Sequence, residues 1–298
     1  MKTIINWGII GCGNVTEIKS GPAFQQVDGF EIHTVMRRNL ELAKNYAQRH
    51  QIENYSNNAD ELINNPSIDA IYIATPPDSH FHYAMKVAEA GKICCIEKPM
   101  ATNYNDCVTI NSIFQKKKIP LFVTYYRRSL PRFEKVKALL DDKIIGQVRH
   151  VNWQLNKKVR DIDISKKYNW RTDAEIAYGG YFDDLACHGL DLFTHFFGDV
   201  KEAAGVSYNQ QDLYTAKDTV AGSWLHKNGI TGSGYWNFGA FDKKDVVEVV
   251  GNEGKIVFSI FEETPIQLVI GDKEETIFIE NPKHIQQYHV ENIYEDLV

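Results

Sequence analysis

The chain has 298 residues, of which 43% are hydrophobic and 24% are charged, and its formal net charge at pH 7 is −6. This composition is typical of a globular protein with about two domains. The negative charge argues against nonspecific binding to nucleic acid or to an anionic membrane, and no apolar run reaches the length of a membrane-spanning helix.

The cysteines and the N-terminus indicate the compartment. The five cysteines are odd in number and show no CxxC spacing. Met1–Thr3 lead straight into an apolar segment, with no signal-peptide pattern. These features predict a cytoplasmic protein with reduced thiols, without a disulfide framework and without a structural zinc site.

A glycine loop follows the first apolar run, residues 4–10. After the loop come a helix-compatible segment and residues 30–36, which alternate like a half-buried strand. In this order the first glycine permits a tight turn, and the second lets the backbone approach a pyrophosphate at the N-terminus of the helix. The alternative is a tight turn that binds no nucleotide. The predicted nucleotide-binding residues of the loop are Gly11, Gly13, Asn14 and Val15.

Two positions depart from the usual dinucleotide fingerprint. Thr16 replaces the small residue that allows close packing of helix on strand, so we expect a displaced helix. Arg37 and Arg38 follow the second strand, where an acid would bind the ribose 2′-hydroxyl of NAD. Because guanidinium groups pair bidentately with phosphate, they favour NADP(H). NAD(H), with an arginine stacked on adenine, remains the alternative.

Strands and helices continue to alternate through residue 122. Apolar runs at 69–74, 93–96 and 120–124 predict buried parallel strands, and 79–90 and 105–118 predict helices between them. The repeated βα pattern predicts an α/β fold whose N-terminal Rossmann domain, residues 1–122, contains a doubly wound parallel sheet.

Ligands of open parallel sheets bind at the carboxyl ends of the strands. Thr75 and Pro76 follow one predicted strand, and Glu97 and Lys98 follow the next. We therefore expect these residues at one crevice, with His80 shaping the cofactor pocket. A solvated surface lysine is the alternative interpretation of Lys98.

The pattern changes in the second half of the chain. Residues 148–155 alternate with period two, and Asn228-Gly229 predicts a hairpin turn between two strands. One helix is expected at 180–197. We expect residues 123–298 to form a C-terminal α+β domain for substrate binding and oligomerisation, with a large, mostly antiparallel open sheet. Large apolar residues on both phases of strands 220–238 favour a homodimer or homotetramer.

Four motifs together resemble the glucose–fructose oxidoreductase / inositol dehydrogenase (Gfo/Idh/MocA) family. They are the glycine loop, Tyr72–Pro76, Glu97–Pro99, and residues 179–191 with Asp184 and His188. The resemblance runs from residue 4 to about residue 290. It departs from the family at Thr16, at 125–128, where an asparagine often precedes the arginines, and after His284, where family members usually continue further.

The resemblance implies an NAD(P)-dependent dehydrogenase acting on a secondary alcohol or ketone of a sugar, cyclitol, polyol or diol. It implies that His188 is the acid/base, that Lys98 orients and polarises, and that Asp184 holds substrate hydroxyls or the imidazole. The family varies in which of His188 and Lys98 carries the proton. Two further sets follow: Trp170 and Arg171 for the cofactor, and Tyr126, Asp184 and His188 for the substrate.

Other functions remain open at this point. The same architecture serves a non-catalytic dinucleotide-binding regulator, although a regulator has no reason to keep both Lys98 and His188. Other family reactions are biliverdin-type reduction and redox-assisted glycoside cleavage. Asp184, His188 and Asp191 share one helical face, so they could also form a structural polar stripe. A metal site is disfavoured because no third strong ligand motif accompanies them.

Overall fold

The computed structural model describes residues 4–298; Met1–Thr3, which entered the expectation about a signal peptide, lie outside these residues. The chain forms two compact units, one of Met1–Tyr126 with Pro282–Val298 and one of Arg127–Asn281. The domain boundaries predicted from the sequence placed Pro282–Val298 in the second domain, residues 123–298. This segment belongs to the first unit because Val290 and Ile293 are buried in that unit's core.

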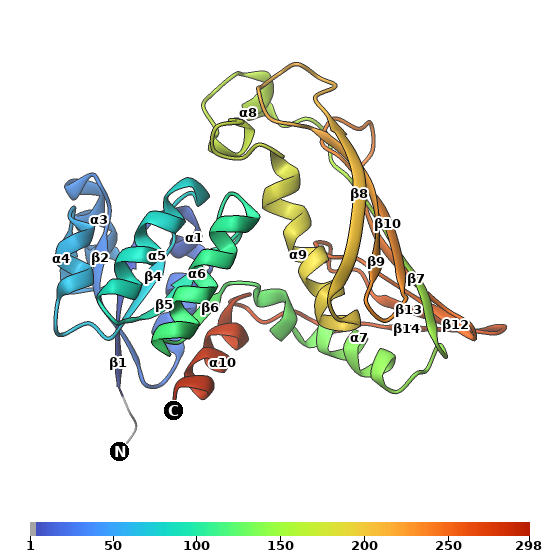
Figure 1. The fold of residues 1–298 in the computed structure, drawn as a ribbon, viewed down its shortest axis with the longest axis horizontal. Coiled ribbons are helices and arrows are strands. Elements are labelled where there is room, and N and C mark those ends of the chain that lie inside the picture. Colours follow the sequence, from blue (N-terminus) through green and yellow to red (C-terminus); the bar gives the residue numbers. More distant parts are fainter. Residues whose placement is uncertain (1–3) are drawn as a thin grey trace. The chain divides into compact units, whose positions relative to one another are not determined.

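The first unit contains a parallel sheet with the strand order β3-β2-β1-β4-β5-β6, six strands within residues 4–298 (Figure 1). Its arrangement is the doubly wound Rossmann order predicted from the βα pattern. The strands are β1 (Ile5–Ile10), β2 (Phe30–Met36), β3 (Asn54–Ser56), β4 (Ala70–Ile73), β5 (Ile93–Ile96) and β6 (Leu121–Val123).

Helices cover both faces of this sheet because its strands are apolar on both sides. In β1, Trp7 and Ile9 belong to one buried cluster and Ile10 to the other. The first cluster includes residues of α2 (Ser20–Gln26), α3 (Leu40–Arg49) and α10 (Gln287–Leu297). The second includes residues of α4 (Ala59–Asn64), α5 (His80–Glu89) and α6 (Tyr104–Lys117).

The second unit contains an eight-stranded sheet with the order β14-β13-β12-β11-β7-β10-β9-β8. Its neighbouring strands are antiparallel except β7 and β10, which are parallel. This confirms the mostly antiparallel sheet. The strands are β7 (Val148–Asn156), β8 (Val200–Tyr208), β9 (Thr219–His226), β10 (Thr231–Asn237), β11 (Lys244–Gly251), β12 (Gly254–Phe258), β13 (Ile266–Ile270) and β14 (Lys273–Ile277).

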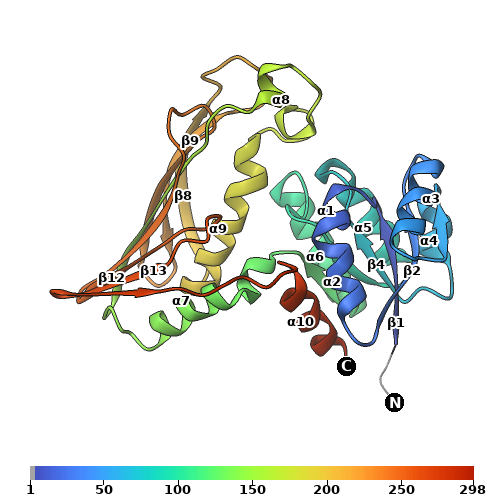
Figure 2. The same cartoon turned by 180° about the vertical axis from the view of Figure 1, so that it is seen from behind.

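Two helices, α7 (Pro131–Asp141) and α9 (Tyr181–Phe197), pack on one face of this sheet (Figures 1 and 2). In α9, Phe193 packs edge-on to Trp153 of β7, with ring centroids 5.9 Å apart. A Cβ on Gly189 would lie 2.4 Å from the Trp153 ring, so glycine permits this close approach. In α7, Phe133 packs against Phe258 of β12.

The opposite face of the sheet carries both polar and apolar side chains, with a polar row on its central strands β7 and β10. His150 of β7 lies 2.9 Å from the hydroxyls of both Thr231 and Ser233 of β10. The side chain of Asn152 also donates to the Ser233 hydroxyl, at 2.8 Å. Of the large apolar residues expected on both phases of 220–238, Trp224, Trp236 and Phe238 are buried on one phase, and Leu225 and Tyr235 lie on the other among small or polar residues.

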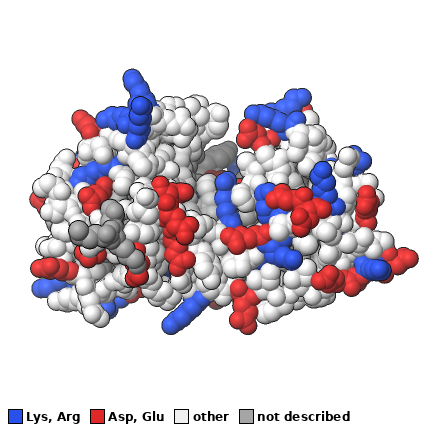
Figure 3. Space-filling model, turned by 90° about the horizontal axis from the view of Figure 1, so that it is seen from below, with Lys and Arg blue, Asp and Glu red and all other residues white. Residues whose placement is uncertain are grey.

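Short elements complete the described part of the chain. They are α1 (Asn14–Ile18), α8 (Asp161–Ile164) and the 3-10 turns η1 (Pro77–Ser79), η2 (Tyr126–Ser129) and η3 (Trp170–Thr172). No helix among residues 4–298 is both long and apolar enough to cross a membrane. Acidic and basic side chains are interspersed over the face shown in Figure 3.

Candidate active site

The glycine loop runs tightly between the ends of β2 and β4. The amides of Gly11 and Cys12 both donate to the carbonyl of Met36, at 2.9 and 3.1 Å. Gly11 has φ +94°, and a Cβ there would lie 2.9 Å from the amide nitrogen of Thr75. A Cβ on Gly13 would meet only the Gly11 carbonyl oxygen, at 3.7 Å. The first glycine is thus required by the turn, and the second leaves open space at the helix start.

Thr16 caps the start of the helix that follows the loop. Its hydroxyl accepts from the Gly13 amide and donates to the Gly13 carbonyl, both at 2.9 Å. Its own carbonyl accepts from the hydroxyl of Tyr46, at 2.9 Å. The helix ends at Ile18 and a second one, α2, begins at Ser20. The segment after the loop therefore forms two short helices.

Arg37 and Arg38 are exposed immediately after β2. The Arg37 amide donates to the carbonyl of Ser56 at 3.2 Å, and the Asn39 side chain caps α3 by accepting from Leu42. The three residues that follow Met36 are two arginines and an asparagine, so the chain places no acidic residue directly after β2.

The end of β5 is held by a buried carboxylate. Glu97 accepts a 2.7 Å hydrogen bond from the hydroxyl of Tyr72 and a 3.1 Å bond from the amide of Lys98. The Lys98 amide also donates to the hydroxyl of Thr124, at 3.2 Å. The side chain of Gln286 reaches Glu97 at 3.5 Å. Burial, followed by the charge of Glu97, raises the pKa of Tyr72 well above its usual value.

His80 connects the two strand-end loops of the first unit. The side chain is fully buried, at 0% exposure. Its Nε2 lies 2.8 Å from the carbonyl oxygen of Thr75, and its Nδ1 lies 3.0 Å from that of Pro99. The structure thus brings together Thr75, Pro76, His80, Glu97 and Lys98, and the Lys98–Pro99 peptide is cis.

In the second unit, an arginine holds the predicted substrate-binding carboxylate. Arg171 Nε donates to Asp184 Oδ2 at 2.7 Å, and its guanidinium lies 4.2 Å from the centroid of the Trp170 ring. Asp184 is 8% exposed. Trp170 and Arg171, predicted for the cofactor, therefore lie beside Asp184, predicted for the substrate.

His188 lies one helical turn beyond Asp184 in α9 and is 4% exposed. Its ring packs edge-on against Phe261, with centroids 6.0 Å apart. One turn further, Asp191 accepts two hydrogen bonds from Arg128, at 2.7 and 2.5 Å. Burial raises the pKa of Asp191, although Arg128 acts in the opposite direction. The stripe is thus a histidine between two carboxylates, each of which pairs with an arginine.

The loop that carries Phe261 was missed by sequence reasoning. Asp245 accepts from the Ser259 hydroxyl and the Phe261 amide, at 2.5 and 2.6 Å. Arg132 donates to the carbonyls of Glu262 and Ser259, at 2.6 and 2.9 Å. The guanidinium of Arg127 lies 4.6 Å from the Phe261 ring centroid. Nothing local signals these contacts, because Arg132 and Ser259 are 127 positions apart.

The predicted residues thus form one group in each unit. Tyr126, the last residue of the first segment of the first unit, is buried. Within residues 4–298, no group of three or more His, Cys, Asp or Glu side chains is placed to hold a metal ion.

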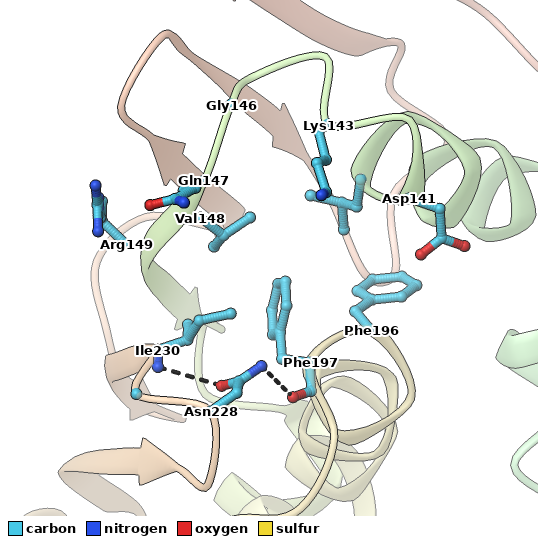
Figure 4. A pocket seen from close by; sticks show the side chains of 12 residues that line it. Asp141, Lys143, Gly146, Gln147, Val148, Arg149, Phe196, Phe197, Asn228 and Ile230 are labelled. Atoms are coloured by element: carbon cyan, nitrogen blue, oxygen red, sulfur yellow. Dashed lines mark hydrogen bonds between the residues drawn. The ribbon is translucent and has the colours of Figure 1, made fainter.

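A separate cavity of about 510 Å³ lies within the second unit, at the end of α9 (Figure 4). Asn228 lines this cavity. Its side chain donates to the carbonyl of Phe197 at 2.9 Å and accepts from the amide of Ile230 at 3.2 Å. Its other lining residues include Leu140, Lys143, Gln147, Arg149 and Phe196. None of these was predicted as a site residue.

The six-stranded Rossmann sheet and its glycine loop define an NAD-binding oxidoreductase class. Two family models match segments of this chain. Residues 5–125 match the Gfo/Idh/MocA oxidoreductase family, NAD-binding Rossmann fold. Residues 133–257 match the GFO/IDH/MocA C-terminal domain. The chain belongs to the Gfo/Idh/MocA family of oxidoreductases.

Individual relatives agree with this assignment. The chain is 41% identical to Oxidoreductase P35 of Formosa agariphila over 98% of this chain and 90% of the relative. It is 25% identical to the scyllo-inositol 2-dehydrogenase (NADP(+)) IolW of Bacillus subtilis over 65% of this chain and 52% of that enzyme.

A solved levoglucosan dehydrogenase, in complex with NADH and levoglucosan, shares the fold. Its TM-score is 0.86 at 21% identity, with 99% of this chain and 90% of that chain covered.

Proposed function

We propose that this protein is an NAD(P)-dependent dehydrogenase or reductase that acts on a secondary alcohol or ketone of a sugar, cyclitol, polyol or diol. The observation that carries the proposal is the buried His188, one turn from an Asp184 carboxylate held by Arg171 at 2.7 Å. The relatives named as levoglucosan and scyllo-inositol 2-dehydrogenases support this substrate class.

The first unit would bind the cofactor. Gly11 and Gly13 let the loop backbone, with Asn14 and Val15, approach the pyrophosphate. When bound, the nicotinamide accepts a hydride from an alcohol or returns one to a ketone. Arg37 and Arg38 would bind a 2′-phosphate, which makes NADP(H) the favoured cofactor and NAD(H) the alternative.

The chain's own residues would manage the proton. His188 accepts the hydroxyl proton as the hydride leaves the carbon that bears this hydroxyl group. That carbon loses two electrons, and the imidazole gains one proton. A histidine titrates in the range that this exchange requires. Lys98 donates a hydrogen bond to the reacting oxygen. Asp184 and Tyr126 bind substrate hydroxyls.

The position of Lys98 is well suited to this role. Its amide is fixed by Glu97 and by Thr124, at 3.1 and 3.2 Å. A backbone held at two points limits the volume that the ammonium group can sample, and positioning of this kind lowers the entropic cost of the reaction.

A substrate panel tests the proposal. Purified protein is mixed with NADP⁺ or NAD⁺ and a series of sugars, inositols and anhydrosugars, while nicotinamide absorbance is monitored. Turnover that His188→Ala lowers about 10²- to 10⁴-fold supports the proposal. Binding of NADPH without turnover of any compound would favour a dinucleotide-binding regulator instead.

A further inference from the structure

The starting observation is the environment of the His80 ring. Its two nitrogens face backbone carbonyls from two different loops, Thr75 O at 2.8 Å and Pro99 O at 3.0 Å. The ring is fully buried, so water does not compete for these carbonyls. A neutral imidazole bonds one carbonyl in each of its tautomers, and an imidazolium bonds both.

One end of this contact supports the wall of the glycine loop. Thr75 packs so closely on Gly11 that a Cβ on the glycine would lie 2.7 Å from the threonine Cγ2. The hydroxyl of Ser79 donates to the Thr75 hydroxyl at 2.6 Å and lies 3.0 Å from the Pro76 carbonyl. His80 Nε2 therefore contacts the backbone of the residue that packs on Gly11.

The other end completes the support of Lys98. The Lys98 amide is already held by Glu97 and Thr124. The next residue, Pro99, has no N–H to donate, so its carbonyl is its hydrogen-bonding group in this loop. His80 Nδ1 lies 3.0 Å from that carbonyl oxygen and thereby holds the chain on the far side of Lys98.

We propose that His80 is a positioning residue that supports two loops, each through the tautomer that protonates the facing nitrogen: its Nε2 end supports the Thr75–Pro76 wall of the cofactor loop, and its Nδ1 end supports the backbone that carries Lys98. The proposal rests on the proposed function for the roles of those two loops. Support of the cofactor loop thus depends on Nε2 of His80, and support of Lys98 depends on Nδ1.

Two amide substitutions separate the ends. The amide nitrogen of asparagine mimics Nδ1 of histidine, and that of glutamine mimics Nε2. His80→Asn should keep the Pro99 bond and lose the Thr75 bond, and His80→Gln should do the reverse. His82→Gln is the matched control, because His82 is exposed on the same helix.

The direct readout is amide hydrogen exchange by mass spectrometry, which needs no activity. His80→Gln should speed exchange about fivefold to tenfold in peptides covering Lys98–Ala101, and His80→Asn should do so in peptides covering Thr75–Ser79, the scale of one lost hydrogen bond. The same acceleration in both segments for both variants, or none, would overturn the proposal. A purely structural role predicts that uniform pattern.

Kinetics give the second readout. His80→Gln should lower kcat about 10- to 100-fold through a displaced Lys98 while the Kd for NADPH stays nearly unchanged. His80→Asn should mainly raise that Kd. If the wild type turns over no substrate, the proposed function fails, whereas the exchange pattern and the NADPH titration still decide the role of His80.

Discussion

Arg171 Nε donates to Asp184 Oδ2 across 2.7 Å, from the η3 turn to the first turn of α9. The same guanidinium stacks on Trp170. Arg171, predicted to bind the cofactor, and Asp184, predicted to bind the substrate, thus form one ion pair. The orientation of the Asp184 carboxylate therefore depends on Arg171.

Asp184→Asn should therefore impair turnover through misorientation, with less loss than removal of His188 or Lys98. Arg171→Met should impair turnover through the same carboxylate, because it removes the hydrogen bond to Asp184. The two losses should be non-additive in a double-mutant cycle, with a coupling of about 1 kcal/mol for a partly exposed pair. Steady-state kcat/KM for the four proteins gives this coupling, and strictly additive losses would contradict it.

Cofactor choice should depend on the two arginines after β2. Replacing both Arg37 and Arg38 by alanine should weaken NADP(H) binding by about 1–3 kcal/mol, the scale of hydrogen bonds to charged groups. NAD(H) binding should change much less, because it lacks the 2′-phosphate. Fluorescence titration of NADPH and NADH measures both. Equal losses, or tighter binding of NADH by the wild type, would contradict the NADP(H) preference.

The proton step should require His188 and Lys98 as a unit. His188→Ala should lower kcat about 10²- to 10⁴-fold, the usual contribution of general acid–base catalysis, with NADPH affinity nearly intact. Lys98→Ala should cost a similar factor. The double variant should be far less impaired than the product of the two losses, because residues acting together are non-additive. Full activity in His188→Ala would make the α9 stripe structural.

Stability should respond to the protonation of His80. Burial lowers the pKa of His80 below its ordinary 6.5 and outweighs its carbonyl partners and the charge of Glu97. The unfolded chain therefore binds this proton at a higher pH than the folded chain does. The contribution of the neutral His80 ring to the free energy of unfolding is therefore fully present above pH 6.5. It is lost as the pH falls toward the pKa of His80 in the folded protein.

Calorimetry from about pH 7 to about pH 5, the range in which histidines titrate, measures this effect. We expect the Tm of the wild type to fall more steeply than that of His80→Gln. Identical slopes would show that another group controls the acid response.

Assembly should use the uncovered face of the eight-stranded sheet. This face carries a hydrogen-bonded row of His150, Asn152 and Ser233, and α7 and α9 occupy the other side. We expect a dimer or tetramer by light scattering at micromolar concentration. Ser233→Arg should dissociate it, whereas Asn105→Arg, on an exposed turn of α6, should not. A monomeric wild type would refute the expectation.

Local patterns predicted most of the elements near the candidate site. The apolar run 93–96 is β5, the helix expected at 180–197 is α9, and Asn228-Gly229 joins β9 to β10. These features are visible because burial on both faces, helical periodicity and turn chemistry each leave a mark within a few residues.

Other elements had no such mark. All nine residues of β8, Val200–Tyr208, are exposed, so this edge strand lacks an apolar pattern. The parallel pairing of β7 with β10 joins residues about 80 positions apart and depends on the whole sheet. The contacts of Arg127 and Arg132 with residues 259–264 join residues at least 127 positions apart, and no local propensity predicts them.

The assignment of Pro282–Val298 to the first unit has a consequence for how the protein can be divided. Tyr294 packs edge-on against Phe30, with ring centroids 5.3 Å apart. The second unit is therefore an insertion within a discontinuous first unit, and one cut of the chain cannot release an intact nucleotide-type fold. A stand-alone version would have to join Tyr126 to Pro282 by a linker, so that α10 still covers its face of the parallel sheet.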